Sequence, residues 1–255
     1  MKSAWLAAAF VFAAFILPAA ACERARPIAL AYHPSEADAS LRFEGYREAV
    51  ERAAPAYVRV IVCQPASGTG RENAEMAGGI INGASGVVVD ASGLVVTAAH
   101  IALDTKNDAL VITMDGRGLK ARILRVDPAR ELALLQIAPY AGMRVAEFGD
   151  SDALKAAEPV FAVGTPDNRG GIVSLGRVIA PKLDGRLEYN GFGFADAIKM
   201  RIDVVPGNSG GPIFDRAGRL IGIVGAFGLP DPGEKASRLG YAVPSNAIRA
   251  YLARR

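Results

Sequence analysis

Ser209 lies in the part of the sequence best suited to expose a reactive side chain. Residues 205–212 read VPGNSGGP, so the serine stands among three glycines and between two prolines. A helix does not tolerate this composition, and a strand gains little from it. A tight turn that presents a hydroxyl and several backbone N–H groups does suit it, and a nucleophilic serine needs such donors for its developing oxyanion. The stretch is either a catalytic turn or an ordinary glycine-rich loop, and a base and an acid elsewhere must decide.

The order of the candidate residues along the chain restricts the type of catalytic site. The letters GNSGG around Ser209 also fit the G-x-S-x-G pattern of α/β-hydrolases, but those enzymes place the histidine after the serine. The two histidines of this chain, His33 and His100, both precede Ser209. This order excludes the α/β-hydrolase interpretation, because any base must come before the nucleophile.

His100 is the better candidate for that base. It ends residues 93–100, GLVVTAAH, in which a buried type of strand runs into small residues. Small neighbours let a hydroxyl approach the imidazole closely. His33 stands beside Pro34 in a stretch without a strand pattern, and we expect it at the surface. A histidine at a strand end is often only structural, so a third residue is still needed.

Several motifs in the same order resemble those of the HtrA/Deg family of trypsin-like serine proteases. They are SGVVVD (85–90), TAAH (97–100), DPARELALL (127–135), GIVS (171–174), PGNSGGP (206–212) and GYAVPSN (240–246), within about residues 56–252. The resemblance implies an all-β fold of two six-stranded β-barrels with the site between them. It also implies His100 as general base, Ser209 as nucleophile, and the backbone amides of Gly207 and Ser209 as the oxyanion hole.

The third member of the expected triad departs from the family pattern. The family places an acid, normally aspartate, directly before the run LALL (132–135), where this sequence has Glu131. Three interpretations follow. Glu131 serves as the acid, since glutamate can orient a histidine; Asp127 substitutes from a proline-flanked turn; or the site is weakened and the chain is a peptide-binding protein on a protease fold. A wrong triad acid can lower turnover by about 10⁴.

The substrate pocket is the least defined part of the expected site. Asp203 lies six residues before Ser209, the spacing at which trypsin places its pocket acid. The resemblance to HtrA proteases, in which a nearby aspartate is structural, favours small aliphatic substrate side chains instead. The same resemblance places Val224, Gly225 and Ala226 along the pocket wall.

The rest of the sequence contains many short strands that could hold these residues. Runs rich in valine and isoleucine occupy 57–63, 86–90, 93–97, 109–114, 120–126, 132–137, 160–163, 172–179, 197–204, 212–214, 220–227 and 241–243. Their spacing predicts a sandwich or a pair of barrels rather than βαβ units. Turn signals such as DASG (90–93) and DRAG (215–218) separate some of them.

Two helices and several irregular stretches complete the prediction. A helix is expected over 35–53, capped by Ser35 or Ser40 and ended by Pro55, and another over 245–255, capped by Ser245. Residues 23–34 are expected to be irregular. Residues 64–82 and 228–238 are expected to be mobile loops.

The N-terminus reads as an export signal over residues 1–21, with Lys2, an apolar stretch and the alanine triplet 19–21. The apolar stretch is shorter than the roughly 20 residues that span a bilayer, although an uncleaved anchor is the alternative. Cys22 stands where bacterial lipoproteins carry a lipid anchor, but Ala19 replaces the usual large aliphatic residue. Cys63 is expected to be a buried reduced thiol, with a disulfide to Cys22 as the alternative.

Composition excludes other classes of function. The chain has 255 residues, 51% of them hydrophobic, which allows a substantial core, and a net charge of only +3. Its basic residues are scattered, so we do not expect nucleic-acid binding. No cluster of histidine and cysteine suggests a metal, and no cofactor is expected.

The sequence therefore predicts a signal peptide over 1–21, an N-terminal extension with a helix over 22–55, and a trypsin-like protease domain over 56–255. No PDZ domain is expected, so a large cage assembly is not implied, and the oligomeric state is left open. The expected function is a serine endopeptidase for polypeptides in the periplasm or cell envelope. Two rivals remain: a non-catalytic peptide-binding protein, and an esterase or acyltransferase with the same triad.

Overall fold

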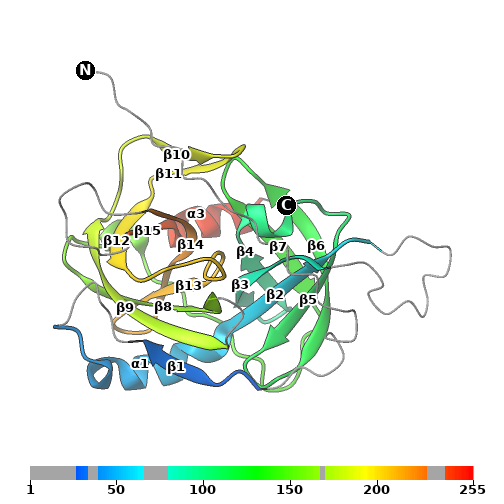
Figure 1. The fold of residues 1–255 in the computed structure, drawn as a ribbon, viewed down its shortest axis with the longest axis horizontal. Helices are drawn as coiled ribbons and strands as arrows, with labels where there is room; N and C mark the ends of the chain where they lie inside the picture. The colour runs from blue at the N-terminus through cyan, green and yellow to red at the C-terminus, as the bar shows by residue number, and fades with distance from the viewer. Residues whose placement is uncertain (1–26, 34–39, 66–79, 167–169, 229–238, 255) are drawn as a thin grey trace.

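The protein folds as two β-barrels that lie side by side (Figure 1). The computed structural model describes residues 27–33, 40–65, 80–166, 170–228 and 239–254. The expected all-β double barrel is confirmed. The predicted signal peptide, Cys22 and most of both predicted mobile loops lie outside the described residues. The loop prediction is wrong at residues 80–82 and 228, which belong to strands.

The first barrel is closed by six antiparallel strands in the order β2-β3-β4-β7-β6-β5. Many of its valines and leucines are buried inside it, among them Val60, Val111 and Leu135, as the sequence pattern predicts. The strands are β2 (Tyr57–Cys63), β3 (Ile80–Asp90), β4 (Leu94–Thr97), β5 (Asp108–Thr113), β6 (Gly118–Asp127) and β7 (Leu132–Ile137). Cys63 at the end of β2 carries a buried thiol.

The second barrel also has six strands, in the order β9-β12-β15-β14-β13-β8, and the pairing of β8 with β9 closes it. Its strands are β8 (Pro159–Gly164), β9 (Gly171–Ala180), β12 (Ile198–Ile202), β13 (Pro212–Asp215), β14 (Leu220–Gly228) and β15 (Leu239–Pro244). Ile198, Ile213 and Val224 belong to its buried interior. Both barrels therefore follow from runs of β-branched residues that bury one face.

One strand was not expected. Residues 30–33 form β1 (Leu30–His33), which pairs in parallel with β9, so the prediction of irregular structure is wrong there and His33 is part of a strand. Four residues are too few to show a strand period. Pairing with the neighbouring sheet makes this segment a strand. Leu30 pairs with Gly171, and a Cβ at Gly171 would come within 2.8 Å of the Leu30 side chain.

A second unexpected element is a hairpin between β9 and β12, at the top of Figure 1. Its strands, β10 (Arg186–Tyr189) and β11 (Phe192–Ala195), form a small sheet of their own. The connecting residues Asn190 and Gly191 have φ of 47° and 82°. Positive φ at both central residues is what a tight type I′ turn requires, and an Asn-Gly pair supplies it. That pair was the available signal in the sequence.

The helices are shorter than predicted. The helical elements are η2 (Phe43–Tyr46), α1 (Arg47–Ala53), η3 (Ala54–Ala56), α2 (Ala99–Ala102), η4 (Ser151–Ala153) and α3 (Ser245–Leu252). Ser40 lies in a turn before η2, whose N-cap residue is Arg42, and its hydroxyl accepts from Arg177 at 3.3 Å; residues 35–39 lie outside the described part. The prediction that Ser245 caps the last helix is wrong. The N-cap residue of α3 is Pro244, and the Ser245 hydroxyl donates to the Gly149 carbonyl at 3.0 Å.

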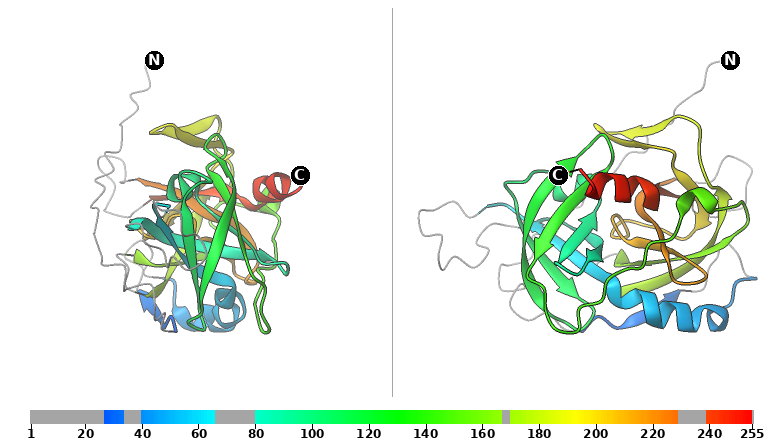
Figure 2. Two further views of the ribbon diagram at one scale, coloured as in Figure 1. Left: turned by 90° about the vertical axis from the view of Figure 1, so that its right-hand side faces the viewer. Right: turned by 180° about the vertical axis from the view of Figure 1, so that it is seen from behind.

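Helix α3 joins the two barrels from behind (Figure 2). Its buried residues Ile248 and Tyr251 face the protein, and it packs on β14 and β15. The guanidinium of Arg125 in β6 lies 3.8 Å from the centre of the Tyr251 ring and donates to the Arg254 carbonyl at 2.6 Å. Among the described residues, no helix is both long and apolar enough to cross a membrane.

Candidate active site

The turn that carries Ser209 owes its shape to its glycines. Gly207 has φ of 98° and Gly210 has φ of 75°, a region that residues with a Cβ rarely adopt. A Cβ at Gly207 would lie 2.2 Å from the Thr165 carbonyl oxygen, and one at Gly210 would lie 2.2 Å from the Thr97 hydroxyl oxygen. Neither glycine can be replaced without moving backbone, which explains the composition of this stretch.

Both barrels hold the turn in place. The Ser85 amide of β3 donates to the Ser209 carbonyl at 3.0 Å, while the Gly210 amide donates to the Val224 carbonyl of β14 at 2.8 Å. The Thr97 hydroxyl donates to the Ser85 carbonyl at 2.7 Å. The turn thus packs against the end of β4, directly before the helical turn that carries His100.

A buried chain of hydroxyls, absent from the sequence-based site, supports the same turn. The Ser85 hydroxyl donates to the Gly207 carbonyl at 2.7 Å and accepts a hydrogen bond from the Thr165 amide at 3.1 Å. The Thr165 hydroxyl in turn shares a hydrogen bond with the Tyr57 phenol. Burial raises the pKa of Tyr57, so this phenol remains a neutral hydrogen-bonding group. The chain fixes the plane of the peptide between Gly207 and Asn208.

Replacing Ser85 by alanine is expected to lower the free energy of unfolding by about 1–3 kcal/mol, since two backbone groups lose their partner inside the protein. It is also expected to lower kcat, because the peptide that follows Gly207 loses its restraint. Urea unfolding and steady-state kinetics measure the two effects. Unchanged stability and unchanged kcat would show that the hydroxyl chain does not restrain the turn.

His100 and Glu131 form a buried pair. Structure places His100 in α2, three residues after β4 ends, and not at the end of the strand itself. Its Nδ1 is hydrogen-bonded to Oε1 of Glu131, whose side chain is completely buried. A carboxylate can only accept a hydrogen bond, so Nδ1 must carry the proton and donate it to Glu131. The other ring nitrogen, Nε2, then carries the lone pair. The imidazole is therefore held in the tautomer that a general base needs.

Asp127, the alternative acid, is engaged elsewhere. Its carboxylate pairs with the Arg130 guanidinium and accepts from the Arg130 amide at 3.1 Å within its own turn. Glu131 follows that turn with a φ of 56°, which glutamate adopts less readily than aspartate. The structure thus brings together His100 and Glu131 and leaves Asp127 apart from the imidazole.

Shortening Glu131 to aspartate is expected to lower kcat by about 10²-fold, because misplacing a catalytic group by about 1 Å has an effect of that size. The melting temperature should stay the same or rise, since aspartate tolerates positive φ better. Steady-state kinetics and thermal unfolding of the same preparation separate these effects. A gain in kcat would contradict the observed fit and mean that the glutamate is poorly placed.

Three of the residues predicted for the substrate pocket are consecutive in β14, and the fourth, Asp203, follows β12. The Val224 side chain is buried in the interior of the second barrel, and Ala226 is 9% exposed. Gly225 lies against the Phe194 ring of β11, to which a Cβ would come within 2.7 Å. Asp203 is half-buried before the serine turn. The backbone of Val224 is hydrogen-bonded to the serine turn, through Gly210 and Gly211.

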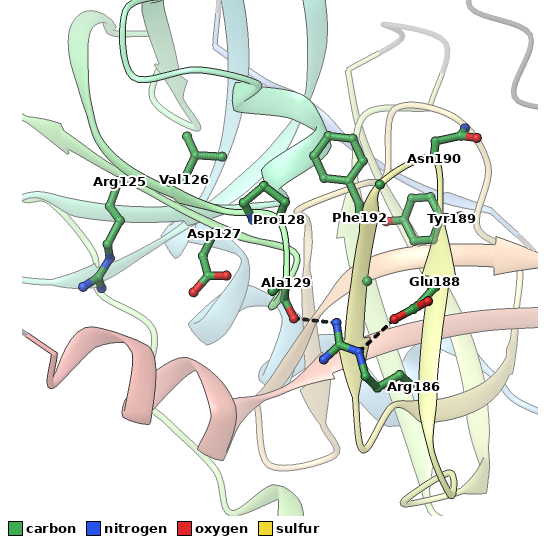
Figure 3. Close-up of a pocket in the computed structure, with 12 residues that line it drawn as sticks. Arg125, Val126, Asp127, Pro128, Ala129, Arg186, Glu188, Tyr189, Asn190 and Phe192 are labelled. Atoms are coloured by element: carbon green, nitrogen blue, oxygen red, sulfur yellow. Dashed lines mark hydrogen bonds and ion pairs between the residues drawn. The ribbon is translucent and has the colours of Figure 1, made fainter.

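A cavity of about 690 Å³ lies beside these elements and contains none of the predicted pocket residues (Figure 3). It is enclosed by residues 125–129 on one side and by the β10–β11 hairpin on the other. The hairpin also reaches the candidate base: the Phe192 ring lies edge-on to the His100 ring, with 6.0 Å between centroids. The Tyr189 ring lies at the same centroid distance, and its hydroxyl oxygen is 3.3 Å from Nδ1 of His100. Sequence reasoning missed both aromatic residues.

Comparisons with known proteins identify the family of this chain. The sequence model of the family described as "Trypsin-like peptidase domain" matches residues 84–223. The periplasmic serine endoprotease DegP of Escherichia coli (strain K12) is 34% identical over 135 residues, 53% of this chain and 27% of DegP. The magnetosome formation protease MamE of Paramagnetospirillum magneticum is 34% identical over 149 residues, 57% of this chain and 20% of MamE.

Solved structures give the same result. The HtrA-type protease AlgW with a tripeptide has a TM-score of 0.66 and 28% identity, covering 82% of this chain and 62% of AlgW. AlgW with a decapeptide has a TM-score of 0.64 at 26% identity, covering 82% and 66%. This chain thus spans about a quarter of the curated relatives and less than two thirds of the solved chains. It belongs to the family of trypsin-like peptidase domains and is similar to the HtrA-type proteases.

Proposed function

We propose that this protein is a serine endopeptidase that cleaves peptide bonds of polypeptides outside the cytoplasm. The observation that carries the proposal is the buried hydrogen bond from His100 Nδ1 to the Glu131 carboxylate. The His100 segment also adjoins the glycine turn of Ser209, through the contact of Gly210 with Thr97 and Ala98. The roles are Ser209 as nucleophile, His100 as general base and Glu131 as the acid that orients it.

The reaction follows from these positions. His100 Nε2 takes the proton of the Ser209 hydroxyl as the oxygen attacks the scissile carbonyl carbon. The imidazolium that forms is stabilised by the buried Glu131 carboxylate and then gives its proton to the leaving amine. Water, deprotonated by the same imidazole, hydrolyses the acyl-enzyme and restores Ser209. Glu131 keeps its hydrogen bond to Nδ1 and does not itself take part in the proton transfer.

The oxyanion of each tetrahedral intermediate is assigned to the amides of Gly207 and Ser209. Preorganised backbone donors of this kind are worth about 10²–10³ in rate each. The positive φ of Gly207 and the Ser85 hydrogen bond to its carbonyl hold this backbone in one conformation. A pre-shaped turn needs no rearrangement when charge develops.

The cellular setting and substrates are inferred from relatives and from the N-terminal sequence. DegP is named as a periplasmic endoprotease, and AlgW is seen with peptides. We infer that residues 1–21 direct export, that 22–55 form an extension and that 56–255 form the peptidase domain, in the periplasm or cell envelope. Small aliphatic side chains are the proposed preference at the cleaved bond. Cys22 remains a candidate lipid-anchor site, which the mass of the mature N-terminus would test.

The test is incubation of the mature protein with casein, beside the Ser209→Ala variant, together with labelling by a fluorophosphonate probe. Cleavage and labelling that both disappear in Ser209→Ala are expected. Labelling without cleavage of any polypeptide would favour an esterase or acyltransferase. Absence of both in the wild-type protein would reject the enzyme and favour a peptide-binding protein that keeps the protease fold.

A further inference from the structure

Tyr189, the last residue of β10, reaches from the hairpin to the catalytic pair. Its hydroxyl donates to the Gly225 carbonyl at 2.7 Å, and its oxygen lies 3.3 Å from Nδ1 of His100. Because the hydroxyl proton is directed at Gly225, the oxygen presents a lone pair to the imidazole. The proton on Nδ1 thus has two acceptors, the Glu131 carboxylate and the Tyr189 hydroxyl.

The environment keeps this hydroxyl neutral. Burial raises the pKa of Tyr189 far above its ordinary value, and the negative charge of Glu131 and a side-chain hydrogen bond with Glu131 raise it further. Ionisation beside the carboxylate would place two negative charges together. The neutral hydroxyl therefore donates to the Gly225 carbonyl and lies as an acceptor beside Nδ1 of His100.

Glu131 alone supports the imidazole incompletely. One of its oxygens contacts Nδ1, but the other, Oε2, is buried and accepts no hydrogen bond from the residues that the structure describes. The side chain also extends from a backbone with positive φ, and it has one more rotatable bond than aspartate. A single hydrogen bond from a flexible side chain leaves the imidazole of His100 some freedom to rotate. A second contact to Nδ1 would restrict that rotation.

The hairpin is fastened so that Tyr189 and Glu131 share one support (Figure 3). The Arg186 guanidinium donates to the Ala129 carbonyl at 2.8 Å, and the Gly193 amide donates to the Pro128 carbonyl at 2.9 Å. Both carbonyls belong to the turn that leads into Glu131. At the other side, the Phe194 ring fills the space left by the missing side chain of Gly225.

We propose that Tyr189 is a positioning residue that holds the His100 imidazole in the tautomer protonated at Nδ1, together with Glu131. The inference rests on the proposed function, since it assigns His100 as the base. It adds a fourth side chain to the catalytic arrangement, supplied by an element outside both barrels. Tyr189 acts on His100 and not on the substrate.

The test is the Tyr189→Phe variant, which keeps the ring and removes only the hydroxyl. Losing one neutral hydrogen bond is expected to lower kcat by about two- to tenfold. The rate of fluorophosphonate labelling should fall by the same factor, while KM for a fluorogenic peptide stays unchanged. The matched control is Tyr32→Phe, the same change on β1, where Tyr32 packs on Phe43 away from the site. A rise in KM alone, or rates equal to those of wild type, would overturn the proposal.

A second measurement does not depend on activity. In protein labelled with ¹⁵N-histidine, the Nδ1 proton of His100 should give a far-downfield ¹H resonance that Tyr189→Phe shifts or broadens and Tyr32→Phe leaves unchanged. The chain has only two histidines, so a His33→Gln variant assigns the signal. If the wild-type protein shows no cleavage, the proposed function fails, but this spectrum still decides the role of Tyr189. An unshifted resonance would overturn it.

Discussion

Alanine at either Ser209 or His100 is expected to lower kcat by about 10⁶-fold, and alanine at both is expected to lower it little further. The reason is that the two residues act as a unit. The imidazole has nothing to deprotonate without the serine, and the hydroxyl is a poor nucleophile without its base. Single-site and double variants assayed on one peptide, over days for the slow ones, give the measurement.

The pattern matters more than the size of the loss. Losses that multiply in the double variant would mean that His100 and Ser209 contribute independently, which a shared proton transfer forbids. A large residual rate in Ser209→Ala, with normal fluorophosphonate labelling, would show that another residue is the nucleophile. Both side chains are buried, so their removal could affect folding. Far-UV circular dichroism checks that each variant is folded.

Glutamine in place of Glu131 is expected to lower kcat by about 10⁴-fold with the fold intact. The amide keeps the length of the glutamate side chain, but it can offer an N–H to Nδ1 and thereby stabilise the tautomer protonated at Nε2. It also removes the charge that stabilises the imidazolium. Steady-state kinetics and the ¹⁵N spectrum of His100 measure the loss and its cause together.

Asp127→Asn is the matched control for Glu131→Gln. It makes the same chemical change four residues earlier, in a carboxylate that pairs with Arg130 and not with the imidazole. Its kcat should stay within a few-fold of the wild-type value. The reverse result, with Asp127→Asn losing most of the activity, would assign the acid to Asp127 and contradict the geometry of the His100–Glu131 pair.

The barrels could be predicted because their strands bury continuous valine and isoleucine runs. The elements that escaped prediction lack that signal. Strand β1 has four residues and takes its position from β9. The hairpin carries Gly193 within a strand, where glycine is a weak strand former, yet a Cβ there would lie 2.4 Å from the Leu187 carbonyl oxygen. Packing against a partner strand, not local preference, selects that residue.

Only those site residues that lie in distinctive sequence motifs could be predicted. Ser209 and His100 stand in distinctive stretches, and Glu131 holds the position that the resemblance to HtrA proteases assigns to the acid. Tyr189 is separated from His100 by 89 positions, and Ser85 from Gly207 by 122. Contacts over such distances depend on how the barrels and the hairpin meet. Ser245 shows the same effect. Local sequence rules predict that its hydroxyl caps the helix, but the hydroxyl donates to the distant Gly149 carbonyl.

The hydrogen bonds at the serine turn have a consequence for the integrity of the whole molecule. Ser209 is held through its carbonyl by β3, while the next residue is held through its amide by β14. Ser209 thus belongs to the interface between the barrels and to neither barrel alone. A half-molecule could keep its own strands and still have no reactive serine, so activity reports the docking of the two halves more directly than any measure of secondary structure does.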